Sequence, residues 1–481
     1  MHTVGRRGVL LGGLAGAAVA GSARPSAARG APRVVVVGAG LAGLTTAHRL
    51  RQRTGWRVEV HEARDRVGGR ALTVRDLPGG LHAEAGGSFV STGDHAFRNL
   101  ARELRVGLTD LDTVWPSGGY DYRFAGRNRS RAAVLHGRPE VAREAEREFG
   151  RIPWPVRHGT RDPEALRLDR MTASAWVERH VAPVNPLLAD YVRTYVETEY
   201  TAPADEASAL MVVADLAAPW RSYDERFVVT DGTDTVATAL AEGLDGSIHL
   251  GSALVAVRRR AHGYRLTFED DTSRTQVDAD AVVFALPFPT LAAVDLSRAG
   301  FSPLKRRAIR LGALGVGMKA SLVLDSTPWQ PGSSGESFSD LATGSTWPGH
   351  PGQQSDQALM VCLTGASAMP HVAGAPVHGL APRRLADAYL RDLDRVFPGS
   401  RAAYAGVTRV DRWVDDPWTR GTYSYYRVGT MTEIAGAEAL PEGAAFFAGE
   451  HTAHYTNRST LNGAVWSGNR AAEQVLAYLR R

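Results

Sequence analysis

Apolar residues after position 30 follow a strand pattern, then a helix pattern, then a strand pattern again. Residues 34–37 read VVVV, a continuous apolar run of the kind found in strands that are buried on both faces. Leu44, Ala47 and Leu50 recur at helical spacing, and residues 57–60 alternate as a second strand. The pattern therefore predicts a strand, a helix and a second strand in one α/β unit.

Two later stretches add further elements. Residues 247–287 alternate like a set of antiparallel strands that ends in a buried strand, and residues 446–448 form a short apolar strand. A helix that opens near Gly463 follows, with small residues along one face. Because small faces let a helix N-terminus come close to a ligand, this helix is predicted to approach one.

The two remaining regions differ in pattern. Helical periodicity dominates residues 109–233, with one helix over 140–151 and another after Thr172, a helix-capping residue. In the second region, strands are predicted at 319–324 and 358–364. Between them the stretch PGSSGESFSDLATGSTWPGHPGQQ is rich in Gly, Ser and Pro, and we expect it to be the least structured part of the mature chain.

Residues 1–30 are predicted to be an export signal. Arg6 and Arg7 precede a Gly- and Ala-rich apolar stretch that ends near Ala20 and is too short to span a bilayer. Consecutive arginines before a weakly apolar core resemble a twin-arginine signal, and an ordinary secretory signal is the alternative. We therefore leave these residues out of the fold and expect the protein to be secreted or periplasmic.

Composition excludes some functions. At 481 residues the chain is expected to form two domains. Its net charge of +5 comes from arginines scattered among nearly as many acids, and no nucleic-acid motif accompanies them, so a nucleic-acid partner is not expected. The single cysteine, Cys362, cannot form an intramolecular disulfide. No metal site and no membrane span in the mature chain are predicted.

Three glycines after the first strand give the first chemical signal. Gly38, Gly40 and Gly43 have the spacing G-x-G-x-x-G. In a strand–turn–helix context the first allows a tight turn, the second lets backbone approach a pyrophosphate, and the third lets helix pack on strand. Glu62 follows about 20 residues later, where an acid accepts hydrogen bonds from an adenosine ribose. The chain is therefore predicted to hold a dinucleotide in a Rossmann-type unit.

The residues after Glu62 separate FAD from NAD. In ARDRVGGRALT, Arg64 and Arg70 bracket two glycines that allow close approach to a diphosphate, which Arg70 can neutralise. Together with AEAGGSFVSTGDHAFRNLARELRVGL, this stretch resembles the flavin-dependent amine oxidase family. The resemblance implies FAD. The second glycine cluster, GALGVG at 312–317, runs into a strand and is interpreted as a turn, so a bound nicotinamide donor is not supported.

Two more segments carry the same resemblance. Residues 446–476 strongly resemble the C-terminal FAD motif of the family, and residues 247–287 resemble its middle segment. By that resemblance Glu450 meets the ribityl or phosphate region, Leu461 lies beside the isoalloxazine, and backbone near Leu254 contacts adenine. The predicted cofactor-binding residues are Gly38, Gly40, Leu41, Ala42, Gly43, Glu62, Arg64, Gly69, Arg70, Gly87, Ser88, Leu254, Gly449, Glu450 and Leu461.

The resemblance implies an α/β fold in which a Rossmann-type FAD-binding domain, assembled from three segments, carries an inserted α+β substrate domain. The FAD-binding segments are expected at residues 33–108, 234–309 and 414–481. The substrate domain is expected to comprise residues 109–233 and 310–413.

Three residues are predicted to be catalytic. Flavin oxidises a C–N bond by taking hydride at N5, and the protein must orient an uncharged amine. By the resemblance, Tyr423 and Thr460 occupy the two wall positions in front of the flavin, and a Thr there is typical of the polyamine oxidase and demethylase branch. Lys319 falls on the strand whose lysine holds a water against N5, a task for which Arg is too bulky and always charged. Lys305 is expected to have no role.

Thr422 stands where covalent members of the family carry Cys, so FAD is predicted to be noncovalent. The leading functional hypothesis is an oxidase of small amines that passes electrons to oxygen and releases peroxide. An L-amino-acid oxidase is the nearest alternative, but it would need an Arg to clamp the substrate carboxylate, and none follows Gly87 directly. A desaturase or tailoring oxidase and a non-enzymatic flavoprotein are further alternatives. Glu197 and Glu199 are candidates for holding a distal ammonium, unless they are surface acids.

Overall fold

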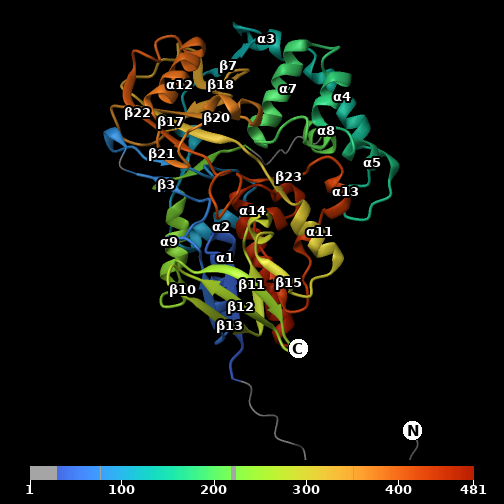
Figure 1. Ribbon diagram of the computed structural model, residues 1–481. Coiled ribbons are helices and arrows are strands. Elements are labelled where there is room, and N and C mark those ends of the chain that lie inside the picture. The colour runs from blue at the N-terminus through green and yellow to red at the C-terminus, as the bar shows by residue number, and fades with distance from the viewer. Residues whose placement is uncertain (1–29, 76, 218–223, 350) are drawn as a thin grey trace, which may run out of the picture.

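The structure is a computed structural model that describes residues 30–75, 77–217, 224–349 and 351–481 (Figure 1). The predicted export signal lies outside the described residues, apart from its last position. Within the described ranges no helix is both long and apolar enough to cross a bilayer.

A five-stranded parallel sheet forms the centre of the lower half of the molecule in Figure 1. Its order is β10-β2-β1-β14-β24, and every neighbouring pair is parallel. Three separate stretches of the chain therefore build one Rossmann-type sheet, as predicted. The strands are β1 (Arg33–Val37), β2 (Arg57–His61), β10 (Ile248–His249), β14 (Ala281–Phe284) and β24 (Ala445–Phe447).

Helices α1 (Leu41–Arg53) and α14 (Leu461–Leu479) pack side by side on one face of this sheet. A Cβ at Gly43 would lie 1.9 Å from the Gly38 carbonyl oxygen, so only glycine lets α1 sit this close to the turn. The small face of α14 has a similar use, because a Cβ at Gly468 would lie 2.5 Å from the Ala42 carbonyl. Sequence reasoning assigned that face to ligand approach, whereas at Gly468 it serves helix–helix packing. Helices α2 (His95–Glu103) and α9 (Asp234–Glu242) complete the layer.

The other face is covered by a small second sheet, which contains the antiparallel strands that the alternating pattern of residues 247–287 predicted. Strands β11 (Ala253–Arg259), β12 (Tyr264–Glu269) and β13 (Arg274–Ala279) pair antiparallel, and β15 (Asp295–Arg298) pairs parallel with β11. The β11–β12 register passes from Leu254 to Ala256, so Val255 is bulged out of the ladder. A bulge leaves the backbone groups of the extra residue free of ladder hydrogen bonds.

An eight-stranded sheet dominates the upper half of Figure 1, in the order β21-β22-β17-β20-β19-β18-β7-β8. Two of its strands confirm the prediction for residues 319–324 and 358–364. The strands are β7 (Gly119–Phe124), β8 (Arg127–Arg129), β17 (Met318–Leu324), β18 (Ser333–Ser339), β19 (Ser345–Pro348), β20 (Ala358–Thr364), β21 (His378–Leu380) and β22 (Tyr404–Asp411).

The Gly/Ser/Pro-rich stretch was wrongly predicted to be the least structured part of the mature chain. It supplies β18 and β19, which pair with each other and are flanked by β7 and β20. Ser337 bonds Thr346 across the pair at 2.8 Å, and Ser339 bonds Thr343 at 3.1 Å. The serine and threonine hydroxyls, which make the sequence resemble a loop, thus form hydrogen bonds with one another inside the sheet.

Helices from the first insertion gather beside this sheet (Figure 1). The predicted helix over 140–151 is found as α4 (Arg138–Phe149). Thr172 caps α6, as predicted, by accepting the Ala175 N–H at 3.0 Å. The other helices of the region are α3 (Arg131–Val134), α5 (Pro163–Asp169), α6 (Ala173–His180), α7 (Pro186–Glu199) and α8 (Ala209–Ala217), and α12 (Arg383–Val396) follows from the second insertion.

The smaller elements connect the two halves. The stretch GALGVG, interpreted as a turn, includes the short strand β16 (Ala313–Leu314), which pairs with β23 (Ser424–Tyr425). The remaining strands are β3 (Thr73–Val74), β4 (Ala83–Glu84), β5 (Phe89–Val90), β6 (Leu108–Asp110) and β9 (Phe227–Val229). The remaining helices of four residues or more, leaving aside 3-10 turns, are α10 (Phe288–Leu291), α11 (Pro303–Leu311) and α13 (Thr430–Ile434).

Lys305 on α11 has a structural role, contrary to the sequence-based expectation. Its side chain is buried, and Nζ donates to the carbonyls of Ala437 at 2.7 Å and Glu438 at 2.8 Å. The ammonium also lies 3.7 Å from the centre of the Phe447 ring. Arg306 and Arg307 in the run LKRRAIR are exposed, whereas Lys305 is on the inward side of the helix.

Candidate active site

One cavity of about 840 Å³ extends from the carboxyl ends of β1 and β2 to the eight-stranded sheet. All three predicted catalytic residues line it, and so do all predicted cofactor-binding residues except Gly43, which packs α1 onto the turn. Residues that are hundreds of positions apart in the chain therefore meet around one space.

The turn between β1 and α1 fits a pyrophosphate. Gly38 has φ +102°, a left-handed conformation that favours glycine. A Cβ at Gly40, which lines the cavity, would meet no protein atom within 4 Å, so the space beside this backbone belongs to the cavity. The first N–H groups of α1 have no partner within the helix and carry the positive end of its dipole.

Glu62 stands where the ribose acid is expected. One carboxylate oxygen accepts the Ala39 N–H at 2.8 Å, and the other accepts the Arg64 N–H at 3.0 Å. Each oxygen accepts more than one hydrogen bond, so Glu62 can hold the glycine turn and still accept ribose hydroxyls. The bulge places Val255 in the cavity wall beside Leu254, the place where backbone is predicted to contact adenine.

The two arginines have different surroundings. Arg64 donates through Nη2 to Asp416 and to Thr419, both at 2.6 Å, so its guanidinium is held by protein groups. Arg70 donates to Glu450 at 3.0 Å and to the Thr422 carbonyl. Within the described chain these bonds leave only from Nη1, which leaves other donors of Arg70 for a phosphate.

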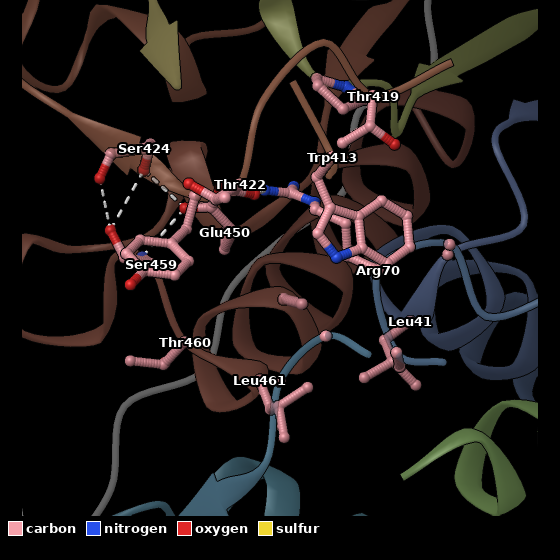
Figure 2. Close-up of a pocket in the computed structure, with 18 of the residues that line it drawn as sticks. Leu41, Arg70, Trp413, Thr419, Thr422, Ser424, Glu450, Ser459, Thr460 and Leu461 are labelled. Carbon is pink, nitrogen blue, oxygen red and sulfur yellow. Dashed lines mark hydrogen bonds and ion pairs between the residues drawn. The ribbon is translucent and has the colours of Figure 1, made fainter. Parts of the chain in front are cut away.

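Glu450 is the centre of a polar cluster in the cavity wall, with Ser424 and Ser459 (Figure 2). Its Oε2 accepts the Ser424 hydroxyl at 2.5 Å and the Ser459 N–H at 2.9 Å. Burial works to raise the pKa of this carboxyl, but Arg70, Arg458 and the Ser424 hydrogen bond outweigh it and hold the pKa below its ordinary value. Glu450 therefore stays ionised and fixes the loop that leads to Thr460 and Leu461.

Lys319 reaches from β17 into the FAD-binding half of the molecule. Its Nζ donates to the Gly86 carbonyl at 2.6 Å and to Ser88 Oγ at 2.8 Å, and lies 5.4 Å from the Trp347 ring centre. Burial lowers the pKa of Lys319 to about 8, against the opposing effect of Glu84 and other acids. A lysine with this pKa can exchange a proton near neutrality.

Tyr423 and Thr460 both belong to the cavity wall. The Tyr423 hydroxyl donates to the Thr198 carbonyl at 3.1 Å, which fixes the ring. Its neighbours Tyr425 and Tyr426 are buried core residues that do not line the cavity, so the structure singles out Tyr423 from the three. Thr460 caps α14, because its hydroxyl accepts the Gly463 N–H at 2.9 Å.

His451 has no catalytic position. It is buried outside the cavity lining, its ring meets Phe288 edge to face at 4.5 Å, and burial lowers its pKa to about 3. Its buried contact with Phe288 suits a residue that shapes the loop.

The far wall of the cavity was not predicted from the sequence. It carries the acids Glu225 and Glu336, with Trp115 and Trp347 among the aromatic side chains. Glu336 is ordered by the Trp115 indole N–H at 3.1 Å and the Ser334 hydroxyl at 2.8 Å. These residues lie in the two insertions and share no spacing motif, so only the fold brings them together.

Glu199 also lines this wall, whereas Glu197, two residues earlier on α7, does not line the cavity and instead accepts a hydrogen bond from Ser367. Burial raises the pKa of Glu199 to about 7. The Glu225 side chain is exposed to the cavity. The surrounding protein still removes much of its hydration, and this desolvation is the largest cause that raises its pKa to about 8. Repulsion from Glu199 and Glu336 raises the pKa further. Close acids of this kind share protons unless a cation lies between them.

A second missed feature is a chain of ion pairs that joins the two halves. His378 Nδ1 contacts Asp411 at 2.9 Å and Nε2 contacts Asp416 at 3.3 Å, and Asp416 holds Arg64. Arg409 also reaches Asp411, at 3.2 Å. Burial alone would lower the pKa of His378, but the two carboxylates raise it above its ordinary value.

This chain predicts a pH-dependent stability. A raised folded-state pKa means that protonated His378 stabilises the fold below its unfolded pKa of about 6.5, and that this contribution is lost as pH rises through the folded pKa. His378→Gln should therefore lower the free energy of unfolding by about 1–2 kcal/mol at pH 6, with the difference from wild type shrinking by pH 9. Thermal unfolding across that range measures it, with His371→Gln, an exposed histidine, as control. Equal differences at both pH values would contradict the prediction.

The sequence profile of the family described as flavin containing amine oxidoreductase matches residues 41–476. The chain belongs to this family, and FAD is the cofactor that the cavity fits. An L-amino-acid oxidase from Siganus canaliculatus is 26% identical over 471 residues, covering 92% of this chain and 86% of the relative. Polyamine oxidase 4 from Oryza sativa subsp. japonica is 26% identical over 477 residues, covering 92% and 88%.

Solved structures share the fold. Putrescine oxidase bound to putrescine superposes with a TM-score of 0.79 at 22% identity, covering 93% of this chain and 99% of that chain. Cyclohexylamine oxidase from Brevibacterium oxydans IH-35A superposes with a TM-score of 0.81 at 19% identity, covering 94% and 100%. The arrangement of an FAD-binding domain with an inserted substrate domain is thus confirmed.

We expect the flavin to be released intact by acid. Thr422 has no thiol, and the one cysteine, Cys362, is fully buried in β20 and does not line the cavity. Acid precipitation should leave all FAD absorbance in the supernatant. Flavin that stays with the pellet would show a covalent link.

Proposed function

We propose that this enzyme oxidises an amine that carries a second positive charge, with molecular oxygen as electron acceptor. The observation that carries the proposal is the acidic far wall formed by Glu199, Glu225 and Glu336. Two of these acids have pKa values raised to about 7 and 8, so a bound cation would favour their ionised forms. An ammonium at the far wall would leave the other end of the substrate facing Tyr423.

The residues near Tyr423 have defined tasks in this proposal. FAD supplies the hydride acceptor when it is bound. The fixed ring of Tyr423 and the side chain of Thr460 orient the amine between them. Lys319, with a pKa of about 8, accepts or donates a proton at Nζ. The aromatic residues Trp115 and Trp347 help to exclude water from the space between the walls.

The alternative of an L-amino-acid oxidase requires a guanidinium that is free to clamp a carboxylate. Among the described residues, five arginines line the cavity: Arg420 donates to the Pro417 carbonyl, the spare donors of Arg70 are assigned to the cofactor phosphate, and four of the five bond a protein carboxylate. These are Arg64 with Asp416, Arg70 with Glu450, Arg226 with Asp110 and Arg458 with Glu438. The charge of the cavity therefore favours cationic substrates.

Peroxide release tests the proposal. 1,4-Diaminobutane should outpace both 1-aminobutane and L-amino acids. Glu199→Gln and Glu225→Gln should each raise the KM for the diamine by about 10- to 100-fold, because each removes a hydrogen bond to a charged group. The KM for the monoamine should change little. Glu197→Gln is the matched control, because Glu197 lies on the same helix but outside the cavity lining. Peroxide from L-amino acids and none from amines would overturn the proposal.

We also propose export by the twin-arginine route, on the strength of Arg6 and Arg7 before a mild apolar core. Replacing both with lysine should retain FAD-loaded protein in the cytoplasm. Unchanged secretion would exclude this route.

A further inference from the structure

Three side chains with metal-binding atoms meet at the edge of the five-stranded sheet, outside the catalytic end of the cavity. Glu59 and His61 lie two residues apart on β2 and therefore point to the same face. His249 on β10 is the direct register partner of His61. One potential ligand atom from each of the three residues lies within 4.8 Å of the others. The sequence predicted no metal site, because the two histidines belong to distant segments.

One ring nitrogen of His61 is available to bind a metal ion. Its Nδ1 is 2.8 Å from Ser252 Oγ, and its Nε2 is buried without a hydrogen-bond partner among the described residues. With the Nδ1 proton on the Ser252 contact, Nε2 carries a free lone pair, as in metal sites whose histidines donate their other N–H to a protein oxygen. His61 itself is only 7% exposed.

Glu59 supplies the negative charge. Arg33 holds one of its oxygens at 2.6 Å, and Arg57 holds the other. The Arg57 side chain is 66% exposed, so it can break its ion pair with Glu59 and turn into solvent. Arg33 would continue to orient the Glu59 carboxylate.

We propose that Glu59, His61 and His249 form a binding site for a divalent transition metal of the Zn²⁺ class. Two imidazoles and one carboxylate are a ligand set that zinc accepts, with a fourth position left for water. Bonds of about 2.0–2.1 Å in tetrahedral geometry place ligand atoms about 3.3 Å apart. The site must therefore contract, and the exposed ring of His249, now stacked on His61 at 4.6 Å, has to rotate to bring its nitrogen inward.

Binding would act on the cofactor end of the fold. The Glu62 N–H donates to the His249 carbonyl at 2.9 Å, and the Ser252 N–H donates to the Glu62 carbonyl at 2.8 Å. A metal ion that links β10 to β2 would therefore stabilise the backbone that positions Glu62. The two guanidinium groups oppose a cation, so we expect a dissociation constant in the micromolar range, on the order of 1–10 µM, weaker than a dedicated zinc site.

Equilibrium dialysis of chelator-treated holoenzyme against ZnCl₂ tests the site, with flavin absorbance confirming that FAD stays bound. We expect one zinc per chain. His249→Ala should weaken binding at least tenfold, whereas His262→Ala, which removes another exposed histidine, should not. Arg57→Ala should tighten binding, because it frees a Glu59 oxygen and removes a positive charge.

The last variant separates a built site from adventitious surface binding, since loss of Arg57 would leave binding at unrelated histidines unchanged. Three results would each overturn the proposal: no saturable zinc, wild-type affinity in His249→Ala, or no tightening in Arg57→Ala. None of these readouts depends on the substrate or on amine oxidation.

Discussion

Lys319→Met should slow turnover while FAD remains bound. The expected loss is about a hundredfold or more, because that is the usual contribution of one positioned proton-transfer group to the rate. Lys319 is the one lysine that lines the cavity, and its Nζ is held between the Gly86 carbonyl and Ser88 Oγ. Lys319→Arg should fail nearly as badly, because a guanidinium keeps its proton and does not fit the place of a compact ammonium. Rapid mixing measures flavin reduction and reoxidation separately.

The pH profile distinguishes proton transfer from packing. Because burial lowers the pKa of Lys319 to about 8, the wild-type rate should show a titration step near pH 8 that Lys319→Met lacks. Ser321→Ala, two residues along the same strand and outside the cavity lining, controls for a change in β17. If Lys319→Met binds FAD and runs both half-reactions at the parent rate, Lys319 is only a tether between domains.

Arg458→Leu should lower the free energy of unfolding by about 3–5 kcal/mol, the cost of leaving a buried charge without its partner. Arg458 donates to Glu438 and to the Tyr426 hydroxyl, both at 2.9 Å, and to the His451 carbonyl at 2.6 Å. The Arg458 and Glu438 side chains are 5% and 2% exposed, so water cannot replace the lost partner.

Thermal unfolding at fixed, saturating FAD measures this effect, because ligand concentration itself shifts the transition. The double variant Arg458→Leu/Glu438→Leu should recover much of the loss, since it removes the orphaned charge. The exposed pair of Arg274 and Glu269 is the control, and Arg274→Leu should cost about 0–1 kcal/mol. Equal losses from Arg458→Leu and Arg274→Leu would contradict the prediction.

The FAD-binding end could be predicted because its signals are local. Gly38, Gly40 and Gly43 lie within one strand–turn–helix, where spacing alone fixes backbone geometry. Glu62 directly follows the next strand, β2, and the motif around Glu450 is continuous with α14. The motifs themselves are local, although the hydrogen bonds that hold Glu62 and Glu450 come from Ala39, Arg70 and Ser424.

The substrate end could not be predicted, because its residues come from separate elements. Glu199 lies on α7, Glu225 precedes β9 and Glu336 lies on β18, with no shared spacing. The role of Lys305 was missed for a related reason: its burial depends on the carbonyls of Ala437 and Glu438, far along the chain. A single sequence gives no measure of contacts at such separations.

The contact of Lys319 with Gly86 and Ser88 bears on how new specificities arise in this enzyme. The lysine belongs to the eight-stranded sheet and its acceptors to the FAD-binding segment, so neither half contains the whole contact. A chimera that received the substrate domain of a relative would need residues 84–88 from the same donor, or the incoming lysine would meet a mismatched loop. Recombination that keeps this loop and β17 together should therefore yield active hybrids more often than recombination that separates them.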